Sequence, residues 1–319
     1  MRVTVLIPLY NQAHFLMAAV ASVRAQSHTD WELLVVDDGS TDGGACQLAS
    51  LEDDRIRVIR QDNAGVSVAR NRGLAEARTS WVALLDADDT WGPSHLSDLL
   101  DLAVRHPEAL ILGTGFWYVD RQGNRLRRSA RIAQSSENAL AEVVISDYCQ
   151  VVQRYGMPFV TSSVMISRAA TLSLGGFKPG VKAGEDLLMW ATLAHHGEVV
   201  CSDECSTFYV EPPMAAPDRV QAIRRPQEPD VVGQALASLG ELPDGLAGLR
   251  AFRANWYRMR AVLWLELNER SRCLSELRLA VECDGVAWKD VGCLMALALP
   301  YWVRLRLVAL KRQRVGSWA

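Results

Sequence analysis

The sequence predicts an α/β protein with a mainly parallel sheet flanked by helices, followed by a C-terminal helical region. Short β-rich runs alternate with amphipathic helical patterns over the first hundred residues, acidic clusters follow two of those runs, and helical patterns dominate after Pro229. Strands that alternate with helices imply parallel crossovers and a sheet that is buried on both faces.

The first strand and helix patterns follow one another without interruption. Val3–Ile7 is β-rich and ends at Pro8, whereas Ala13–Gln26 places apolar residues at helical spacing. The alternation continues with strand Trp31–Val36, helix Gly43–Leu51, strand Arg55–Arg60, helix Val66–Ala77 and strand Trp81–Leu85. Ligands bind beyond the carboxyl ends of strands in such sheets. The residues that follow each strand are therefore the first candidates for a site.

The pattern is looser after Asp89. We expect helix Pro93–Arg105, strand Ala109–Val119, a basic turn at Arg121–Arg131, helix Ala139–Arg154, strand Thr161–Ser167, helix Glu185–His196 and strand Glu198–Val210. Glu211–Pro229 holds five prolines and is predicted to be a linker. Helices are then expected at Val231–Leu239, Leu246–Leu267, Arg270–Val281 and Trp288–Leu310. These patterns place a domain boundary near Glu228, between regions 1–228 and 229–319.

Two acidic clusters lie where predicted strands end. Asp37 and Asp38 follow one strand, and Asp86-Ala87-Asp88-Asp89 follows another. Neighbouring carboxylates repel each other, so their grouping is costly unless they share a cation or a hydroxyl-rich ligand. Oxygen ligands suit Mg²⁺ or Mn²⁺, which commonly keep phosphate oxygens in their remaining positions. The clusters therefore predict a site for a metal-bound nucleotide diphosphate.

Each cluster also has a simpler interpretation. In the first, a carboxylate can accept hydrogen bonds from a base or a ribose, but Ser40 or Asp42 could merely cap the next helix. In the second, Asp86 and Asp88 point the same way because one residue separates them, so one can hold a ribose and the other a metal. The alternative is a surface turn with capping residues.

Two further segments contain charged residues at predicted helix starts. Gly65 opens a helix that contains Arg70, and a diphosphate could use that helix N-terminus and that guanidinium. Arg72 equally suits a solvated helix face. Glu185 and Asp186 lie in the first turn of another helix, where the macrodipole alone favours acidic residues. The functional interpretation is a general base that removes the proton of an attacking sugar hydroxyl.

These segments together resemble glycosyltransferase family 2. The resemblance rests on five motifs that occur in that family's order across about the first 210 residues: Val5–Asn11, Asp37–Asp42, Gly65–Gly73, Asp86–Asp88 and Glu185-Asp186. It implies the GT-A fold, with a Rossmann-like mixed sheet, and inverting transfer from a nucleotide-activated sugar, a UDP-sugar being favoured. The acceptor would be a glycan or a lipid-linked molecule.

The resemblance also implies roles for individual residues. Pro8, Tyr10 and Asp38, with Asp37 beside them, would surround the base. Asp86 and Ala87 would lie near the ribose, and Asp88 would bind Mn²⁺ or Mg²⁺. Asp186 would be the catalytic base, supported by Glu185. One segment departs from the family: Phe208–Pro213 replaces the Tyr-Arg and His that many relatives have after the last strand. This leaves the third protein ligand of the metal undefined.

Composition narrows the class of protein. A net charge of −3 provides no general attraction for nucleic acid. The seven cysteines are scattered without a C-x-x-C pair, which indicates buried thiols in a reducing compartment. The run Val3–Leu9 is too short for a signal peptide. We therefore expect a cytoplasmic protein.

The C-terminus suggests a membrane contact. Val291–Val303 is nearly all apolar and contains Pro300 and Trp302, with Arg304 and Arg306 close behind. Thirteen residues are too few to span a bilayer, which needs about twenty. The segment suits a helix in the membrane interface on the cytoplasmic face, and it equally suits a helix packed on the domain.

Two other functions remain open from the sequence. A nucleotide-sugar-binding scaffold in a glycan-assembly complex would keep the donor motifs without needing Asp186. A nucleotidyltransferase would need a glycine-rich loop with Arg and Lys after the first strand, where this chain has Pro8–Gln12.

Overall fold

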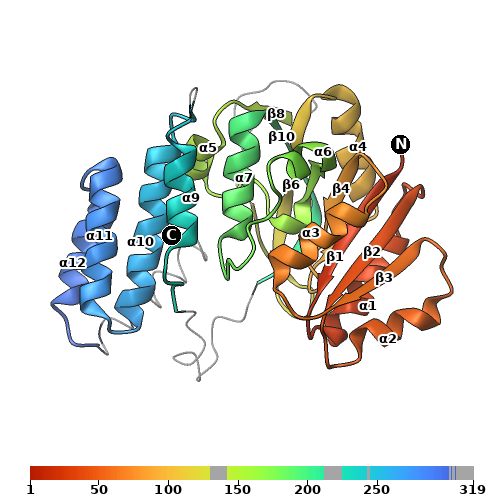
Figure 1. The fold of residues 1–319 in the computed structure, drawn as a ribbon, viewed down its shortest axis with the longest axis horizontal. Coiled ribbons are helices and arrows are strands. Elements are labelled where there is room, and N and C mark those ends of the chain that lie inside the picture. The colour runs from red at the N-terminus through yellow and green to blue at the C-terminus, as the bar shows by residue number, and fades with distance from the viewer. Residues whose placement is uncertain (130–141, 212–224, 243–244, 302, 304–305, 307–319) are drawn as a thin grey trace.

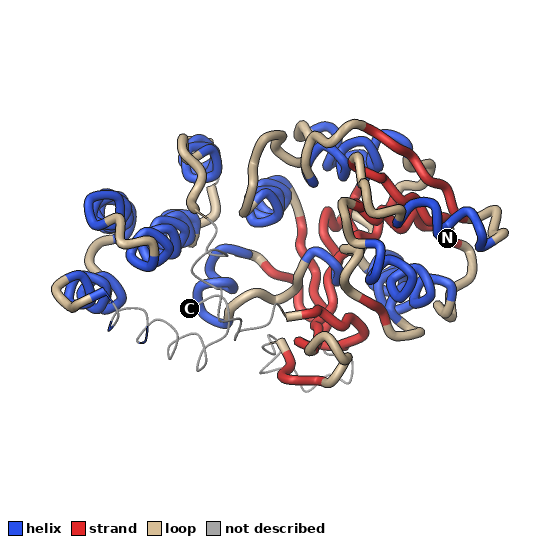
Figure 2. The backbone as a smooth tube through the Cα atoms, turned by 90° about the horizontal axis from the view of Figure 1, so that it is seen from below, coloured by secondary structure: helices blue, strands red, loops and turns tan. Residues whose placement is uncertain are grey.

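The computed structural model describes residues 1–319 except 130–141, 212–224, 243–244, 302, 304–305 and 307–319. Its centre is one mixed sheet with helices on both faces, and further helices form a layer at one end (Figure 1). In a second view the strands gather in one part of the molecule, and the other part is helical (Figure 2). The α/β fold class with a C-terminal helical region is therefore confirmed.

The first part of the chain has the predicted alternation. Its elements are β1 (Val3–Leu9), α1 (Ala13–Arg24), β2 (Trp31–Asp38), α2 (Gly44–Leu48), the short η1 (Ala49–Leu51), β3 (Ile56–Gln61), α3 (Val66–Glu76) and β4 (Trp81–Leu84). β1 is parallel to both β2 and β4, and β2 is parallel to β3. Alternate residues of β1 pack into two separate cores: Val5 and Ile7 lie in one and Leu6 in the other. Both faces of this sheet are therefore covered, as expected.

The second part makes the sheet mixed. Its elements are β5 (Thr90–Trp91), α4 (His95–Arg105), β6 (Ala109–Val119), β7 (Arg125–Arg128), β8 (Glu142–Ile145), α5 (Tyr148–Tyr155), η2 (Thr161–Ser163), β9 (Val164–Ser167), α6 (Arg168–Ser173), α7 (Glu185–His196) and β10 (Glu198–Val210). The main strand order is β3-β2-β1-β4-β9-β6-β10-β5. β9 is antiparallel to β4 and to β6, so parallel pairing is interrupted there.

The predicted helix Ala139–Arg154 is confirmed from Tyr148 onward and is wrong at Glu142–Ile145. Glu142–Ile145 forms β8, which pairs antiparallel with β10, and α5 begins only at Tyr148. Consecutive β-branched residues favour an extended chain here. The Asp147 side chain then accepts a hydrogen bond from the Gln150 N–H at 2.9 Å, which caps α5. Residues 139–141 lie outside the described residues.

Other differences are local. Part of the predicted basic turn is β7, which pairs with β6, and β5 and α6 were not expected. The strand predicted from Thr161 begins at Val164, after the turn η2.

The C-terminal region consists of α9 (Val231–Leu239), α10 (Leu249–Glu266), α11 (Arg270–Asp284) and α12 (Trp288–Leu297). Buried ion pairs join α10 to its neighbours: Arg260 Nη2 lies 2.7 Å from Glu276, and Arg258 Nε lies 2.8 Å from Asp290. One core continues from α7 into α9 and α10. The division at Glu228 stays a prediction, but packing between the two regions is continuous.

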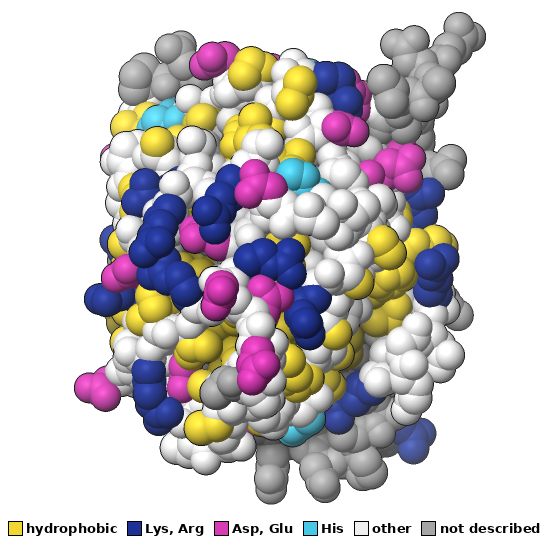
Figure 3. Space-filling model, turned by 90° about the vertical axis from the view of Figure 1, so that its right-hand side faces the viewer, with side chains coloured by type: hydrophobic (Ala, Val, Ile, Leu, Met, Phe, Trp, Pro, Cys, Tyr) yellow, Lys and Arg dark blue, Asp and Glu magenta, His cyan; other side chains and the backbone are white. Residues whose placement is uncertain are grey.

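α12 ends at Leu297, shortly before Pro300, which cannot donate a helical hydrogen bond. The described residues Tyr301, Val303 and Arg306 are helical again, so the predicted helix Trp288–Leu310 is interrupted near Pro300. Most of the chain after Tyr301, including Trp302 and Arg304, lies outside the described residues. Among the described residues, no helix combines the length and apolar character needed to cross a bilayer. On the face shown in Figure 3, basic and acidic side chains are interspersed.

Candidate active site

Strand register brings the predicted donor residues to one edge of the sheet. Leu9 of β1 lies opposite Asp37 of β2, and the Leu85 N–H donates to the Leu6 carbonyl at 3.0 Å. Tyr10, Asp38 and Asp86 each follow directly on these paired positions. The Tyr10 ring is 52% exposed there, so it is accessible to a ligand.

Asp38 ties the end of β2 to the start of α3. One carboxylate oxygen accepts hydrogen bonds from Gln61 Nε2 at 2.7 Å and from the Ala64 N–H at 2.9 Å. The other accepts the Gly65 N–H at 2.8 Å. Gly65 has φ +91°, a conformation that glycine adopts without strain. The carboxylate that was predicted to face the base is therefore held rigidly by the segment that opens α3.

Asp37 and Asp42 hold the backbone around the turn after β2. Asp37 is fully buried, accepts the Ser40 N–H at 2.8 Å and lies 3.3 Å from Arg60 Nη1. Asp42 accepts the N–H groups of Ala13 at 2.8 Å and of Gly44 at 3.1 Å. The capping interpretation thus holds for Asp42 at the start of α2, without excluding a ligand role for Asp38.

Arg70 joins the donor edge to the predicted base. Its guanidinium is 3% exposed and donates from Nη2 to Asp86 at 2.8 Å and from Nη1 to Glu185 at 3.0 Å. The two carboxylates hold the guanidinium charged and raise its pKa above the ordinary value despite burial. The sequence analysis assigned this guanidinium to a diphosphate, whereas both of its terminal nitrogens donate to carboxylates in the structure.

The second acidic cluster contains two kinds of carboxylate. Asp89 is buried and accepts hydrogen bonds from Ser162 Oγ at 2.5 Å and from the Val210 N–H at 2.8 Å. Ser162 Oγ also accepts the Asp86 N–H at 3.0 Å. Asp89 therefore fixes the cluster to β10, and Ala87 of the same cluster is also buried. Burial and the charge of Asp86 raise the pKa of Asp88 to about 6.

A divalent cation fits the chemistry of this cluster. The raised pKa of Asp88 reflects a carboxylate beside another charge in a buried setting, and a cation would relieve that repulsion. Among the residues that the structure describes, no group of three or more acidic, histidine or cysteine side chains could hold a metal ion. Asp88 would thus be supplemented by diphosphate oxygens, as is common for Mg²⁺.

Tyr209 lies beside the same carboxylates. Burial is the main cause that raises its pKa, and the charges of Asp89, Asp86 and Asp88 raise it further. Its ring meets that of Tyr118 edge to face, with centroids 5.7 Å apart. The segment that departs from the family pattern therefore places a phenol next to the acidic cluster.

Asp186 lies at the start of α7, behind Glu185. Burial and the charge of Glu185 raise the pKa of Asp186 to about 6, although Arg70 opposes the shift. One of its oxygens accepts the Leu187 N–H at 2.7 Å, and the other faces Thr161 Oγ1 at 3.5 Å. A carboxylate with this pKa is ionised near neutrality and is still basic enough to take a proton.

Sequence reasoning missed two supporting residues. Ser162 binds both Asp86 and Asp89, and no local pattern marks it. Asn71 accepts the Phe177 N–H and donates to the Phe177 carbonyl, both at 2.7 Å, which fixes the loop before α7 to α3. Asn71 lies inside the quoted motif Gly65–Gly73, next to Arg70, and this adjacency was the available signal.

Comparison with known proteins agrees with this geometry. The model of the family described as glycosyl transferase family 2 matches residues 4–170. The Bacillus subtilis (strain 168) protein TuaG, whose name refers to teichuronic acid biosynthesis, is 32% identical over 213 residues, covering 65% of this chain and 78% of that protein. The succinoglycan biosynthesis protein ExoW of Rhizobium meliloti (strain 1021) is 35% identical over 63% of this chain and 66% of its own. Three further glycosyltransferase relatives are matched over only 33%, 31% and 31% of their lengths.

Solved structures share the fold over nearly the whole chain. Residues 1–349 of S. aureus TarS, in complex with UDP-GlcNAc, superpose with a TM-score of 0.68 at 17% identity, covering 99% of this chain and 92% of that one. The mannosyltransferase PcManGT of Pyrobaculum calidifontis, in complex with GDP-Man and Mn²⁺, superposes with a TM-score of 0.58 at 20% identity, covering 99% and 87%.

Proposed function

The chain belongs to glycosyltransferase family 2, and we propose that it transfers a sugar from a nucleotide diphosphate sugar to an acceptor hydroxyl with inversion at the anomeric carbon. The observation that best supports this proposal is the Arg70 guanidinium, which lies 2.8 Å from Asp86 and 3.0 Å from Glu185. The Arg70 side chain thus joins Asp86, which is expected to contact the sugar donor, to Glu185, which adjoins the expected catalytic base Asp186.

On the donor side, each residue has a role that its surroundings allow. The exposed Tyr10 ring, with Pro8 beside it, would contact the base, and the fixed Asp38 would accept its hydrogen bonds. Asp37 would support the turn beneath, and Asp86, held by Arg70, would face the ribose. The complexes of TarS with UDP-GlcNAc and of PcManGT with GDP-Man support a nucleotide-sugar donor here, and we favour a UDP-sugar.

On the acceptor side, Asp186 would act as the general base. The acceptor oxygen attacks the anomeric carbon, the bond from that carbon to the diphosphate breaks, and the diphosphate leaves with the electron pair. The acceptor proton passes to the Asp186 carboxylate, whose pKa of about 6 suits this transfer. Glu185, paired with Arg70, would keep Asp186 in place.

Asp88 would hold Mn²⁺ or Mg²⁺ together with the diphosphate oxygens. A bound cation of this kind supplies a Lewis acid that stabilises the negative charge of the departing diphosphate. Support comes from the carboxylate chemistry of Asp88 and from the Mn²⁺ complex of PcManGT.

The acceptor is proposed to be a growing glycan or a lipid-linked glycan. Relatives named for teichuronic acid and succinoglycan biosynthesis support a place in polysaccharide biosynthesis. α12 exposes Trp288 at 91% and Met295 at 69%, two positions seven residues apart and therefore on one helix face. We propose that this face contacts the membrane. The test is flotation of the protein with anionic vesicles, compared between the wild type and Trp288→Glu.

Donor screening tests the enzymatic proposal against a scaffold without catalysis. The protein with Mn²⁺ is assayed against a panel of nucleotide sugars for a shift in melting temperature and for release of the nucleoside diphosphate. A donor that raises the melting temperature and is turned over supports the enzyme. Binding without any turnover, even with glycan acceptors present, would favour the scaffold, and no binding at all would refute the donor site.

A further inference from the structure

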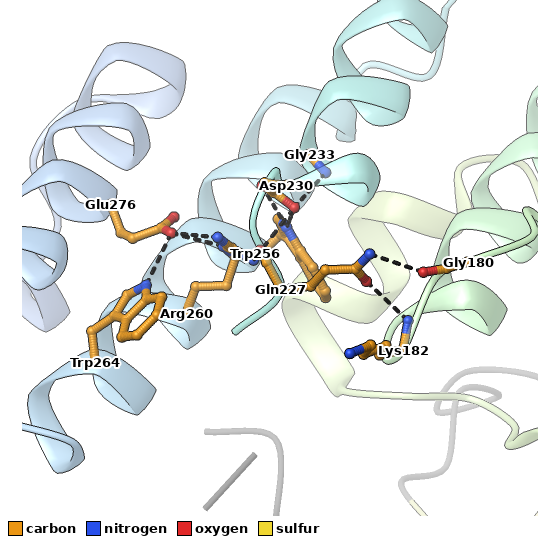
Figure 4. Close-up of polar contacts among 9 residues, drawn as sticks. All are labelled: Gly180, Lys182, Gln227, Asp230, Gly233, Trp256, Arg260, Trp264 and Glu276. Carbon is orange, nitrogen blue, oxygen red and sulfur yellow. Dashed lines mark hydrogen bonds and ion pairs between the residues drawn. The ribbon is translucent and has the colours of Figure 1, made fainter. Parts of the chain in front are cut away.

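A pocket of about 500 Å³ lies between the loop before α7 and the C-terminal helices. Lys182 and Ala183 of that loop form one wall, and Trp256 and Arg260 of α10 form another. Figure 4 shows the polar residues of this junction, with Lys182 on the loop and Arg260 on α10. None of these residues has a role in the proposed donor site.

Gln227 connects the two walls. Its side chain accepts the Lys182 N–H at 3.0 Å and donates to the Gly180 carbonyl at 2.8 Å, while its own carbonyl accepts from Arg260 Nη1 at 3.0 Å (Figure 4). Trp256 and Asp230 also line the pocket, and the Trp256 indole N–H donates to the Asp230 carboxylate at 3.1 Å. These hydrogen bonds hold the loop before α7 in place as one wall of the pocket.

The loop leads directly to the proposed base. Gly184 has φ +84°, and a Cβ at this position would lie 2.6 Å from the Trp256 ring, so the chain passes tightly over α10 before Glu185 and Asp186. Ala183 and Asp186 are three residues apart, and their Cα atoms are therefore at most about 11 Å from each other. The pocket therefore adjoins the segment that carries Asp186, and we take the acceptor hydroxyl to extend from the pocket toward that residue.

The charge of the pocket selects for anions. Three basic side chains and one acidic side chain line it: Lys182, Arg225, Arg260 and Asp230. Arg260 is already neutralised, since it lies 2.7 Å from Glu276 and 3.5 Å from Asp230. Arg225 has one partner, Glu269, at 3.1 Å, and is 60% exposed, so that pair is weak. Within the described part of the chain, no carboxylate lies within ion-pair distance of Lys182.

The rest of the lining is apolar. Val232, Met259 and Leu263 contribute to it together with the Trp256 ring. An apolar pocket with two basic side chains that lack strong partners fits an amphiphilic anion better than a neutral, fully hydroxylated sugar.

We infer that this pocket binds the acceptor through a phosphate group carried on an apolar or sugar moiety, with Lys182 and Arg225 as the contacts to the phosphate. The inference rests on the proposed function, because it assumes that Asp186 is the base toward which the acceptor hydroxyl points. It names the residues that would bind the acceptor and the chemical class to which the acceptor would belong.

Two charge reversals and one matched control test it. Lys182→Glu and Arg225→Glu change residues that line the pocket, whereas Lys178→Glu changes an exposed lysine four positions away that does not. Binding of hexyl phosphate and of glucose 1-phosphate is measured by calorimetry with the donor site saturated by the nucleotide sugar found in the screen. Hexanol and methyl glucoside serve as the neutral counterparts, and donor hydrolysis by water is measured in parallel.

We expect the wild type and Lys178→Glu to bind at least one phosphate probe, and each pocket variant to bind it about tenfold more weakly or worse. Donor hydrolysis should stay within about twofold in all four proteins, because none of the changed residues belongs to the donor site. Preference for hexyl phosphate would identify a lipid phosphate, and preference for glucose 1-phosphate a sugar phosphate.

Two outcomes would overturn the pocket assignment alone, provided that donor hydrolysis is intact. In the first, all four proteins bind both phosphate probes equally, and in the second, none of them binds either probe. Failure of the wild type to bind or hydrolyse any nucleotide sugar would instead overturn the proposed function, and this inference with it.

Discussion

Arg70 of α3 and Glu185 of α7 lie 115 positions apart in the sequence, and their side chains meet at 3.0 Å. The second terminal nitrogen of the same guanidinium lies 2.8 Å from Asp86. One buried cation therefore sets the spacing between the acidic cluster after β4 and the helix that presents Asp186. Any change in this cation should alter both stability and catalysis.

Replacing Arg70 by Ala should leave Asp86 and Glu185 without their shared partner. We expect a loss of about 3 kcal/mol in the free energy of unfolding, at the low end for a buried pair because Asp86 is partly exposed. Displacement of Glu185 should also lower kcat by about 100-fold. Denaturant unfolding and steady-state kinetics give the two values.

Arg72→Ala is the matched control, since Arg72 is 54% exposed and its ion-pair partner among the described residues is Glu76, one turn away. It should cost no more than about 0.5 kcal/mol. Equal effects of the two substitutions would show that the Arg70 bridge has no special role.

The pH dependence of transfer should report Asp186. Because the base acts as a carboxylate and its pKa is raised to about 6, kcat/KM should fall about tenfold per pH unit below pH 6 and level off above it. The pKa of Asp88 lies in the same range, but protonation there should weaken metal-dependent donor binding. Donor affinity measured over the same pH range separates the two, and a flat kcat/KM from pH 5 to 8 would contradict the assignment of Asp186.

Gly73→Ala should destabilise the protein. A Cβ on Gly73 of α3 would lie 2.1 Å from Cδ1 of Leu6, which is fully buried in β1, so the core must repack at a cost of about 1–3 kcal/mol. A Cβ added at Gly292 in α12 meets no atom of the described residues within 4 Å, so Gly292→Ala should instead stabilise the helix by up to about 1 kcal/mol. Thermal unfolding compares them, and a neutral Gly73→Ala would contradict the close packing of α3 on β1.

Asp89 should stabilise the folded protein by anchoring the acidic cluster to β10. Asp89→Ala removes the acceptor for the buried Ser162 Oγ and for the partly buried Val210 N–H, which should cost about 2 kcal/mol. Asp89→Asn keeps one oxygen as an acceptor and should lose less than half of that. If both variants are as stable as the wild type, Asp89 does not anchor the cluster to β10.

Local patterns predicted the first part of the fold well. Alternation from Val3 to Leu85 identified β1 to β4 and their helices because each crossover is short and because β1, β2 and β4 are largely buried, apolar strands. The segment Glu142–Ile145 could not be assigned in this way. Its extended state depends on pairing with β10, more than fifty residues later in the chain.

The sequence singles out the residues that we propose for the site, but it does not show the network that joins them. Asp38 ends a strand, Asp86 and Asp88 follow one, and Asp186 lies in the first turn of a helix, which are positions that a sequence pattern can indicate. The partners of Arg70 depend on how α3 and α7 pack against each other, and the role of Ser162 depends on η2 lying beneath the acidic cluster. Such contacts are tertiary, and no local spacing encodes them.

The most direct test of the account compares Asp186→Asn with the wild type in two measurements on one preparation: donor affinity by calorimetry and transfer rate in a single turnover. The account predicts that affinity stays within about threefold, while transfer falls by about 100- to 10,000-fold. Transfer at the wild-type rate by a fully folded Asp186→Asn protein would contradict it.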